Sequence, residues 1–152
     1  MKNIILFATT LLLWGQCRPK EIPQAANSLD KELRITLNQT IPLTGSNHTD
    51  LGKITLVNLN DSRCPANAMC VRQGAAITTF SLEAGTGNQQ DGQLFIGDFM
   101  PNDARNKRNL TADTMLVQLK DKESYQLILK DVRPYPGTSS EPAEVTFLLK
   151  KP

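Results

Sequence analysis

The chain has 152 residues, a length typical of one domain with a hydrophobic core of its own. Its 17 lysines and arginines nearly balance 15 aspartates and glutamates, which leaves a net charge of +2. Because basic residues are spread along the chain and not clustered, the composition argues against nucleic acid as a partner.

The first 17 residues, "MKNIILFATTLLLWGQC", have the order of a signal peptide. Lys2 precedes an apolar run from Ile4 to Trp14, which is too short to span a bilayer comfortably but suits the apolar core of an export signal. We therefore predict that residues 1–17 direct export of the protein.

Cys17 stands where the apolar run ends, and this resembles the lipobox of bacterial lipoproteins, whose cysteine becomes lipidated. Gln16 occupies the position where that motif has Gly, Ala or Ser, so cleavage nearby by ordinary signal peptidase is the alternative. The chain has three cysteines, and an odd one beside a signal sequence fits lipid attachment. We predict a lipid anchor on Cys17 and a location in the cell envelope; a soluble secreted protein is the alternative.

Residues 18–31, "RPKEIPQAANSLDK", combine two prolines with small and polar residues and have no periodicity. Such a composition is typical of an extended linker. We predict a tether over 18–31 and a single folded domain over 32–152.

Apolar and polar residues alternate with a period of two through most of the predicted domain, which indicates half-buried strands. In "KITLVNLN" the apolar positions change parity midway, which predicts a β-bulge. A further short strand is expected in "QLFIGDF". The alternating segments are 33–37, 76–82, 115–119, 125–129 and 145–149.

Turn-forming segments rich in Gly, Pro, Asn, Asp and Ser separate these strands, and no helical stripe follows the leader. We predict an all-β fold: an antiparallel two-sheet sandwich, immunoglobulin-like, with about seven to eight strands.

Two cysteines lie close together in "DSRCPANAMCVRQGAA", between two predicted strands. In an exported protein Cys64 and Cys70 are expected to form a disulfide, worth about 2 kcal/mol for so short a loop. Pro65 suits the start of a helical turn, so one short turn of helix is predicted at the disulfide. Zinc needs more ligands than these two thiols and the lone His48, and the spacing differs from a C-x-x-C redox motif.

Three segments contain candidate contact residues. The segment around the predicted Cys64–Cys70 disulfide contains Arg63, Pro65 and Met69. A rigid exposed loop of this kind also suits a protease inhibitor, with Pro65 to Met69 as the inhibitory segment. In "MPNDARNKRNLTAD", Arg105 and Arg108 form a basic group for an acidic partner, or simply solvate a long connection. In "RPYPGTSSEP", Tyr135 between two prolines either contacts a ligand or packs over the open end of the sandwich.

The segment Asp61-Ser62-Arg63-Cys64-Pro65, with Cys70 and a glycine before the next strand, resembles a family of small uncharacterised bacterial secreted and lipoprotein domains, many from Bacteroidetes-like organisms. The similarity extends to "ILKDVRPYPGTSSEPAEVTFLLK". Where that family often has an aromatic residue after the second cysteine, this chain has Arg72. The resemblance implies an exported domain of this fold and no specific activity.

These observations predict a non-enzymatic, monomeric envelope module that binds a protein or a small ligand, without metal or cofactor. The alternative is a protease inhibitor that uses the disulfide-braced loop 64–70. An enzyme with an oxygen-rich metal site lacks a recognisable set of catalytic groups.

Overall fold

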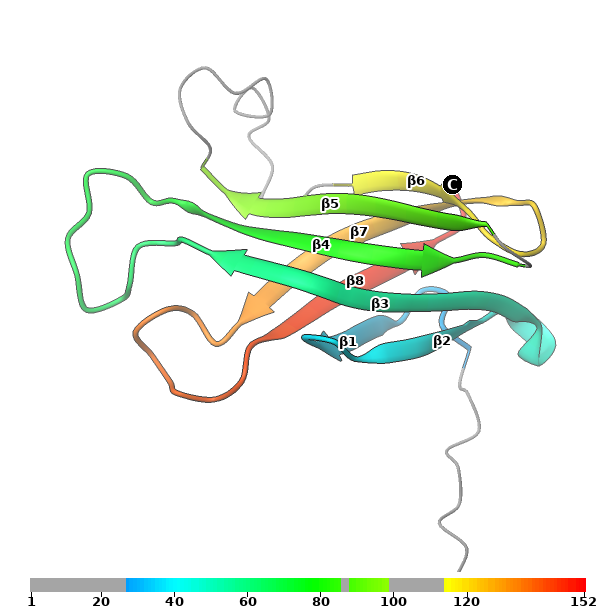
Figure 1. Cartoon of the computed structure of the whole chain (residues 1–152), viewed down its shortest axis with the longest axis horizontal. Helices are drawn as coiled ribbons and strands as arrows, with labels where there is room; N and C mark the ends of the chain where they lie inside the picture. The colour runs from blue at the N-terminus through cyan, green and yellow to red at the C-terminus, as the bar shows by residue number, and fades with distance from the viewer. Residues whose placement is uncertain (1–26, 86–87, 99–113) are drawn as a thin grey trace, which may run out of the picture.

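The structure, a computed structural model, describes residues 27–85, 88–98 and 114–152. Two antiparallel four-stranded sheets pack face to face, with strand orders β1-β8-β7-β6 and β2-β3-β4-β5 (Figure 1). The elements are β1 (Glu32–Thr36), β2 (Thr40–Thr44), the 3₁₀ turn η1 (Ser46–His48), β3 (Asp50–Asp61), β4 (Ala75–Glu83), β5 (Gln89–Gly97), β6 (Thr114–Gln118), β7 (Ser124–Arg133) and β8 (Glu144–Lys150).

Sequence neighbours are also neighbours in space around the whole sandwich. The chain crosses between the sheets twice, from β1 to β2 and from β5 to β6, and β8 returns to pair with β1. Between β5 and β6, at the strand ends away from their connection, the side-chain amide of Gln90 donates to the Gln118 carbonyl at 2.9 Å and accepts from the Gln118 N–H at 3.4 Å. These bonds pair the backbone N–H and carbonyl of Gln118, which would otherwise be unpaired on an edge strand.

The core lies between the two sheets and is built from the alternating positions of the strands. On β4, Ala76, Thr78, Phe80 and Leu82 are fully buried. The Phe80 ring meets Phe147 of β8 edge-to-face, with centroids 6.0 Å apart, and this contact joins the two sheets. Thr78 is tolerated in the core because its hydroxyl donates to the Leu94 carbonyl at 3.0 Å.

The predicted sandwich, its alternating strands and the bulge are confirmed. The pairing of β3 with β4 slips between Leu56 and Asn58, which leaves Val57 half exposed. Sequence reasoning missed β2, because Pro42 interrupts it; the proline is accommodated because β2 is an edge strand.

Two details describe the predicted fold more closely. Within each sheet, β2 to β5 and β6 to β8 follow one another as meanders, whereas immunoglobulin constant domains have Greek-key connections with strand orders ABED and CFG. The predicted helical turn at the disulfide is a single hydrogen-bonded turn, in which the Ala68 N–H donates to the Pro65 carbonyl at 3.0 Å.

This strand order places each described connection at one of the two ends of the sandwich. Because antiparallel neighbours alternate in direction, the described connections after odd-numbered strands lie at one end and those after even-numbered strands at the other. We call the first the loop end; it carries residues 37–39, 62–74 and 134–143 (left in Figure 1). The opposite end, the terminus end, carries 45–49, 119–123 and the C-terminus.

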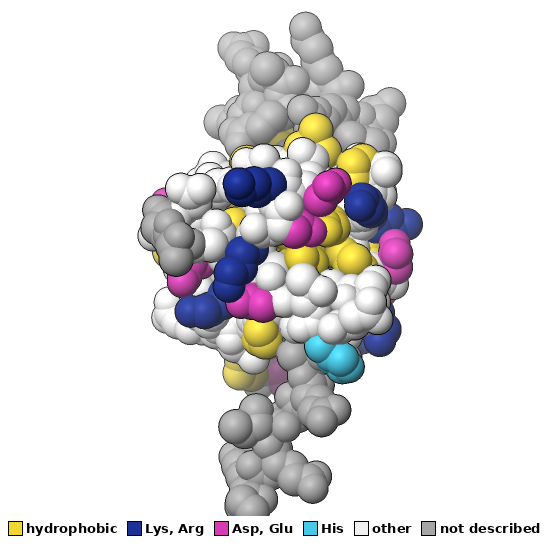
Figure 2. Space-filling model, turned by 90° about the vertical axis from the view of Figure 1, so that its right-hand side faces the viewer, with side chains coloured by type: hydrophobic (Ala, Val, Ile, Leu, Met, Phe, Trp, Pro, Cys, Tyr) yellow, Lys and Arg dark blue, Asp and Glu magenta, His cyan; other side chains and the backbone are white. Residues whose placement is uncertain are grey.

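The described chain also begins at the terminus end. The buried Ser28 donates its N–H to the Thr44 carbonyl at 2.7 Å, and Leu29 bridges to Leu149. The folded domain therefore includes the last residues of the predicted 18–31 tether. Figure 2 views this end directly and shows basic and acidic side chains interspersed on it.

Tyr125 is a buried phenol at the terminus end, and its hydroxyl donates to Asp121 Oδ2 at 2.6 Å. Burial, together with the hydrogen bond to Asp121 and the charge of that carboxylate, raises the pKa of Tyr125 from 10.0 to about 12. Since the folded state holds the proton more tightly, this group's contribution to stability is complete below pH 10 and is lost as pH rises toward about 12.

We expect Tyr125→Phe to lower the free energy of unfolding by about 1 kcal/mol at pH 8, because the hydrogen bond is lost. Urea unfolding at pH 8, 10, 11 and 12 should show this difference shrinking above pH 10, because only the wild-type chain has the Tyr125 phenol, which ionises more readily in the unfolded state. Asp121→Asn keeps the phenol but removes the carboxylate that raises the pKa of Tyr125. In that variant the pH range above 10 over which Tyr125 loses its contribution to stability should be narrower. A difference that stays constant up to pH 12 would contradict the assignment.

Candidate functional site

The loop between β3 and β4 is fixed at its base and closed by a disulfide. Cys64 and Cys70 are bonded, with their Cα atoms 5.9 Å apart, as predicted. Below the ring, the Cys64 N–H donates to the Gln73 carbonyl at 2.7 Å. Gly74 has φ +69°, and a Cβ there would lie 2.0 Å from the Ser62 carbonyl oxygen, so only glycine permits this closure.

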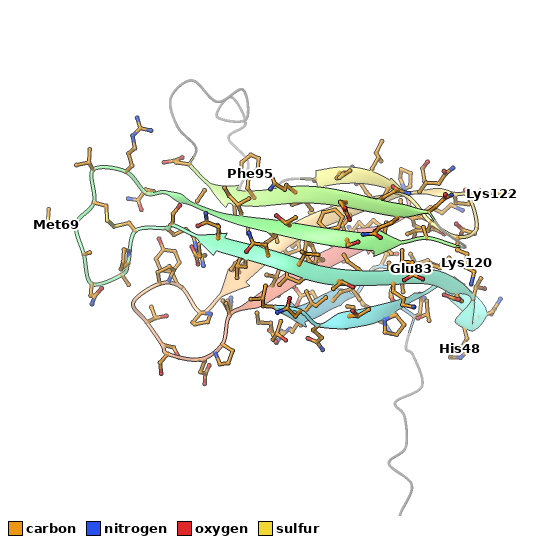
Figure 3. The ribbon with its side chains drawn as sticks, in the orientation of Figure 1. His48, Met69, Glu83, Phe95, Lys120 and Lys122 are labelled. Atoms are coloured by element: carbon orange, nitrogen blue, oxygen red, sulfur yellow. A yellow bond between two sulfur atoms is a disulfide. The ribbon has the colours of Figure 1, made fainter. Side chains whose placement is uncertain are left out.

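Two apolar side chains stand fully exposed at the tip of this loop. Met69 has 103% of its reference surface exposed and Val71 has 105%. Met69 lies at the far extreme of the loop end in Figure 3, whereas His48, Lys120 and Lys122 lie at the terminus end. Single exposed apolar residues are common, but Met69 inside the closed ring and Val71 just beyond Cys70 form a patch that can bury area at little entropic cost.

Arg63 ties this loop to both sheets and is itself only 8% exposed. Its Nε and one terminal nitrogen donate to the two oxygens of Asp61 at 2.8 and 2.6 Å, in a bidentate pair. The same terminal nitrogen donates to the Val132 carbonyl of β7 at 2.8 Å. A side chain from the end of β3 thereby binds the end of a strand in the other sheet.

The guanidinium of Arg63 also covers the ring of Tyr135, with its central carbon 4.6 Å from the ring centroid. Tyr135 belongs to the β7–β8 loop and remains 38% exposed. The stacking is a cation–π contact in a largely desolvated setting. It places Tyr135 over the end of the sandwich, which is the packing alternative considered from the sequence, with part of its surface still accessible.

The two loops also touch through their backbones. The Ala66 N–H donates to the Pro136 carbonyl at 2.8 Å. Gly137 adopts φ +81°, and a Cβ there would lie 3.1 Å from the Pro65 side chain, so the loops approach closely. Residues 62–74 and 134–143 therefore form one joined surface, which we call the loop platform.

A groove of about 650 Å³ runs beside the β7–β8 loop and is continuous with the loop platform. We call it the platform groove. Its walls combine proline and tyrosine surface with charged side chains. It is lined by Arg63, Asp131, Val132, Arg133, Pro134, Tyr135, Thr138, Glu141, Pro142 and Glu144.

Four of the predicted contact residues come together at the loop platform: Arg63, Pro65, Met69 and Tyr135. The Arg63 side chain is buried and hydrogen-bonded within the protein, whereas Met69 is fully exposed and can contact a partner. The lipidation residue Cys17 and the basic residues Arg105 and Arg108 lie outside the described residues.

Sequence reasoning missed the pairing of Asp61 with Arg63 and the acidic side of the groove. The spacing of Asp61 and Arg63, two residues apart at a strand end, was a usable signal, since both side chains of such a pair point to one face. Glu141 and Glu144 gave no such signal, because acidic residues are ordinary in a polar loop.

Two further observations concern metal-ligand groups and membrane-spanning helices in the described part of the chain. No three His, Cys, Asp or Glu side chains in residues 27–85, 88–98 and 114–152 are grouped so that they hold a metal ion. Within the same residues, no helix has the length and apolar character to cross a membrane.

Comparison with protein-family models, with curated proteins and with solved structures finds no match to this chain. The resemblance seen around Asp61 to Cys70 therefore stays a prediction.

We expect Arg63→Met to lower the free energy of unfolding by about 3 kcal/mol, because it leaves the Asp61 carboxylate unpaired at the base of the loop. The matched control is Arg133→Met. Arg133 also pairs with an aspartate two residues earlier, Asp131, but its side chain is 79% exposed, so a loss below about 1 kcal/mol is expected.

Urea unfolding of both variants measures these losses. A double change, Arg63→Met with Asp61→Leu, should recover part of the stability, because it removes the orphaned charge. Equal losses for Arg63→Met and Arg133→Met would show that Arg63 does not join the sheets as described.

Proposed function

We propose that this protein is an exported, lipid-anchored, non-enzymatic module that binds another envelope protein through its loop platform. The observation that carries the proposal is the full exposure of Met69 and Val71 on a loop closed by a disulfide and held at its base by Arg63. A surface that is rigid before it binds loses little conformational entropy on binding. Exposed apolar side chains there supply the buried area that an interface core requires.

The position of the platform relative to the N-terminus supports a protein partner. The described chain enters at the terminus end, through Ser28 and Leu29. The 12 residues of β3 separate the two ends, which corresponds to roughly 40 Å of strand. A lipid on Cys17 would hold the terminus end toward the membrane, so Met69 would project away from the anchoring surface toward other proteins.

A protease inhibitor is the second candidate, and the exposure of Met69 within a closed ring favours it. An inhibitory loop has to offer its backbone to the protease. Because the Ala66 N–H is bound to Pro136, and Pro65 to Ala68 form a closed turn, Met69 is the fully exposed apolar residue of the ring that lies beyond this turn. We therefore expect an inhibitory contact within the predicted Pro65 to Met69 segment to centre on Met69.

Photo-crosslinking in the native envelope tests the binding module. A photoreactive residue at position 69 or 71 should crosslink to the same discrete protein, and one at the exposed Lys122 of the terminus end should not. Adding Met69→Asp should leave the free energy of unfolding within about 0.5 kcal/mol. It should reduce crosslinking from position 71 at least about fivefold. Equal crosslinking from positions 69 and 122, or none from 69 and 71, would contradict the proposal.

The inhibitor candidate predicts stoichiometric inhibition of a protease by the purified protein, abolished by Met69→Asp with the fold intact. Serine, cysteine and metalloproteases are each assayed with a small chromogenic or fluorogenic substrate. Val71→Asp serves as the neighbouring control, because it lies beyond Cys70 and outside the closed ring. Unchanged activity of all three protease classes would eliminate this candidate and leave the binding module.

A further inference from the structure

The platform groove has a fixed charge pattern that restricts what it can bind. Its two arginines are already paired: Arg63 with Asp61 in a bidentate contact, and Arg133 with Asp131 through its Nε. Glu141 makes no ion pair with any described residue, and Glu144, which lies across from Arg133 in the β7–β8 register, forms an ion pair with the exposed Arg34 at 3.8 Å. Once internal pairs are set aside, the groove presents excess carboxylate charge.

Part of the groove surface is apolar and is fixed by contacts within the protein. The Arg63 guanidinium covers one face of the Tyr135 ring. The Tyr135 carbonyl accepts from both the N–H and the hydroxyl of Thr138, at 3.1 and 2.6 Å. Pro134 and Pro142 form further apolar walls. An apolar wall beside the unpaired Glu141 carboxylate and the exposed, weakly paired Glu144 is complementary to a side chain with an aliphatic stem and a cationic head.

We propose that the platform groove binds a lysine or arginine side chain from an extended segment of the partner protein. This inference rests on the proposed function, because it specifies the chemistry of the partner that the loop platform contacts. The aliphatic stem lies against Tyr135 and the prolines, and the head group meets Glu141 and Glu144. Anionic ligands such as phosphate or sulfate are disfavoured by the same carboxylates.

Peptide titration followed by NMR tests the groove directly. The full chain, labelled with ¹⁵N and held in a nonionic detergent micelle, is titrated with acetyl-Gly-Arg-Gly-amide. The matched probe is the same peptide with citrulline, which is nearly isosteric with arginine but uncharged. We expect saturable shifts of the Tyr135, Thr138 and Glu141 amides at millimolar arginine peptide, and binding at least about threefold weaker for the citrulline peptide.

Two variants localise the effect. Glu141→Gln keeps the size of an exposed side chain and should lower the affinity for the arginine peptide about threefold. Glu83→Gln makes the same change near the terminus end, where Glu83 pairs with Lys53, and should leave the affinity unchanged. Added salt should lower the affinity for the arginine peptide and leave the affinity for the citrulline peptide nearly unchanged.

The inference is overturned if the two peptides bind equally, if neither shifts the groove amides, or if Glu141→Gln has no effect. Such a failure is distinguishable from failure of the proposed function, because crosslinking from position 69 depends on the apolar loop tip and not on Glu141. Crosslinking that persists while the groove shows no charge preference would retain the binding module and discard its basic partner segment.

Discussion

The Arg63 guanidinium is the contact on which the loop end of this protein depends. Strand β3 ends at Asp61 in one sheet, and β7 ends at Arg133 in the other. Arg63 bridges these ends by pairing with Asp61, donating to Val132 and covering the Tyr135 ring. A charged group this well buried is tolerated because its bonds replace those it would make to water.

The disulfide and Arg63 stabilise different features of the same surface. The Cys64–Cys70 bond closes a ring within one loop and limits the freedom of Met69, but its sequence separation of 6 means that it joins nothing distant. Arg63 and the Ala66–Pro136 hydrogen bond link that ring to a loop about 70 residues later in the chain. Together they make one preorganised platform from two separate segments, which is the property a binding surface requires.

Much of the fold could be predicted from the residues themselves. Alternation on β4, β7 and β8 identified buried positions such as Phe80, Leu127 and Phe147, because a period of two is a direct consequence of strand geometry. The parity change near Val57 likewise predicted the bulge. β2 was missed because the local signal of Pro42 opposes a strand, and only its edge position in the sheet makes that proline acceptable.

The candidate site was only partly predictable, for a physical reason. Local patterns identified the Cys64–Cys70 disulfide and marked Met69 and Tyr135 as candidates, since pairing over a short loop and exposure in a turn are properties of neighbouring residues. Whether Arg63 contacts Tyr135, and which carboxylates share its groove, depends on the strand order around the sandwich. The sequence by itself thus determined the strands, the bulge and the disulfide. Only the tertiary structure decided that two distant loops form one platform, because antiparallel pairing brings every second connection to the same end.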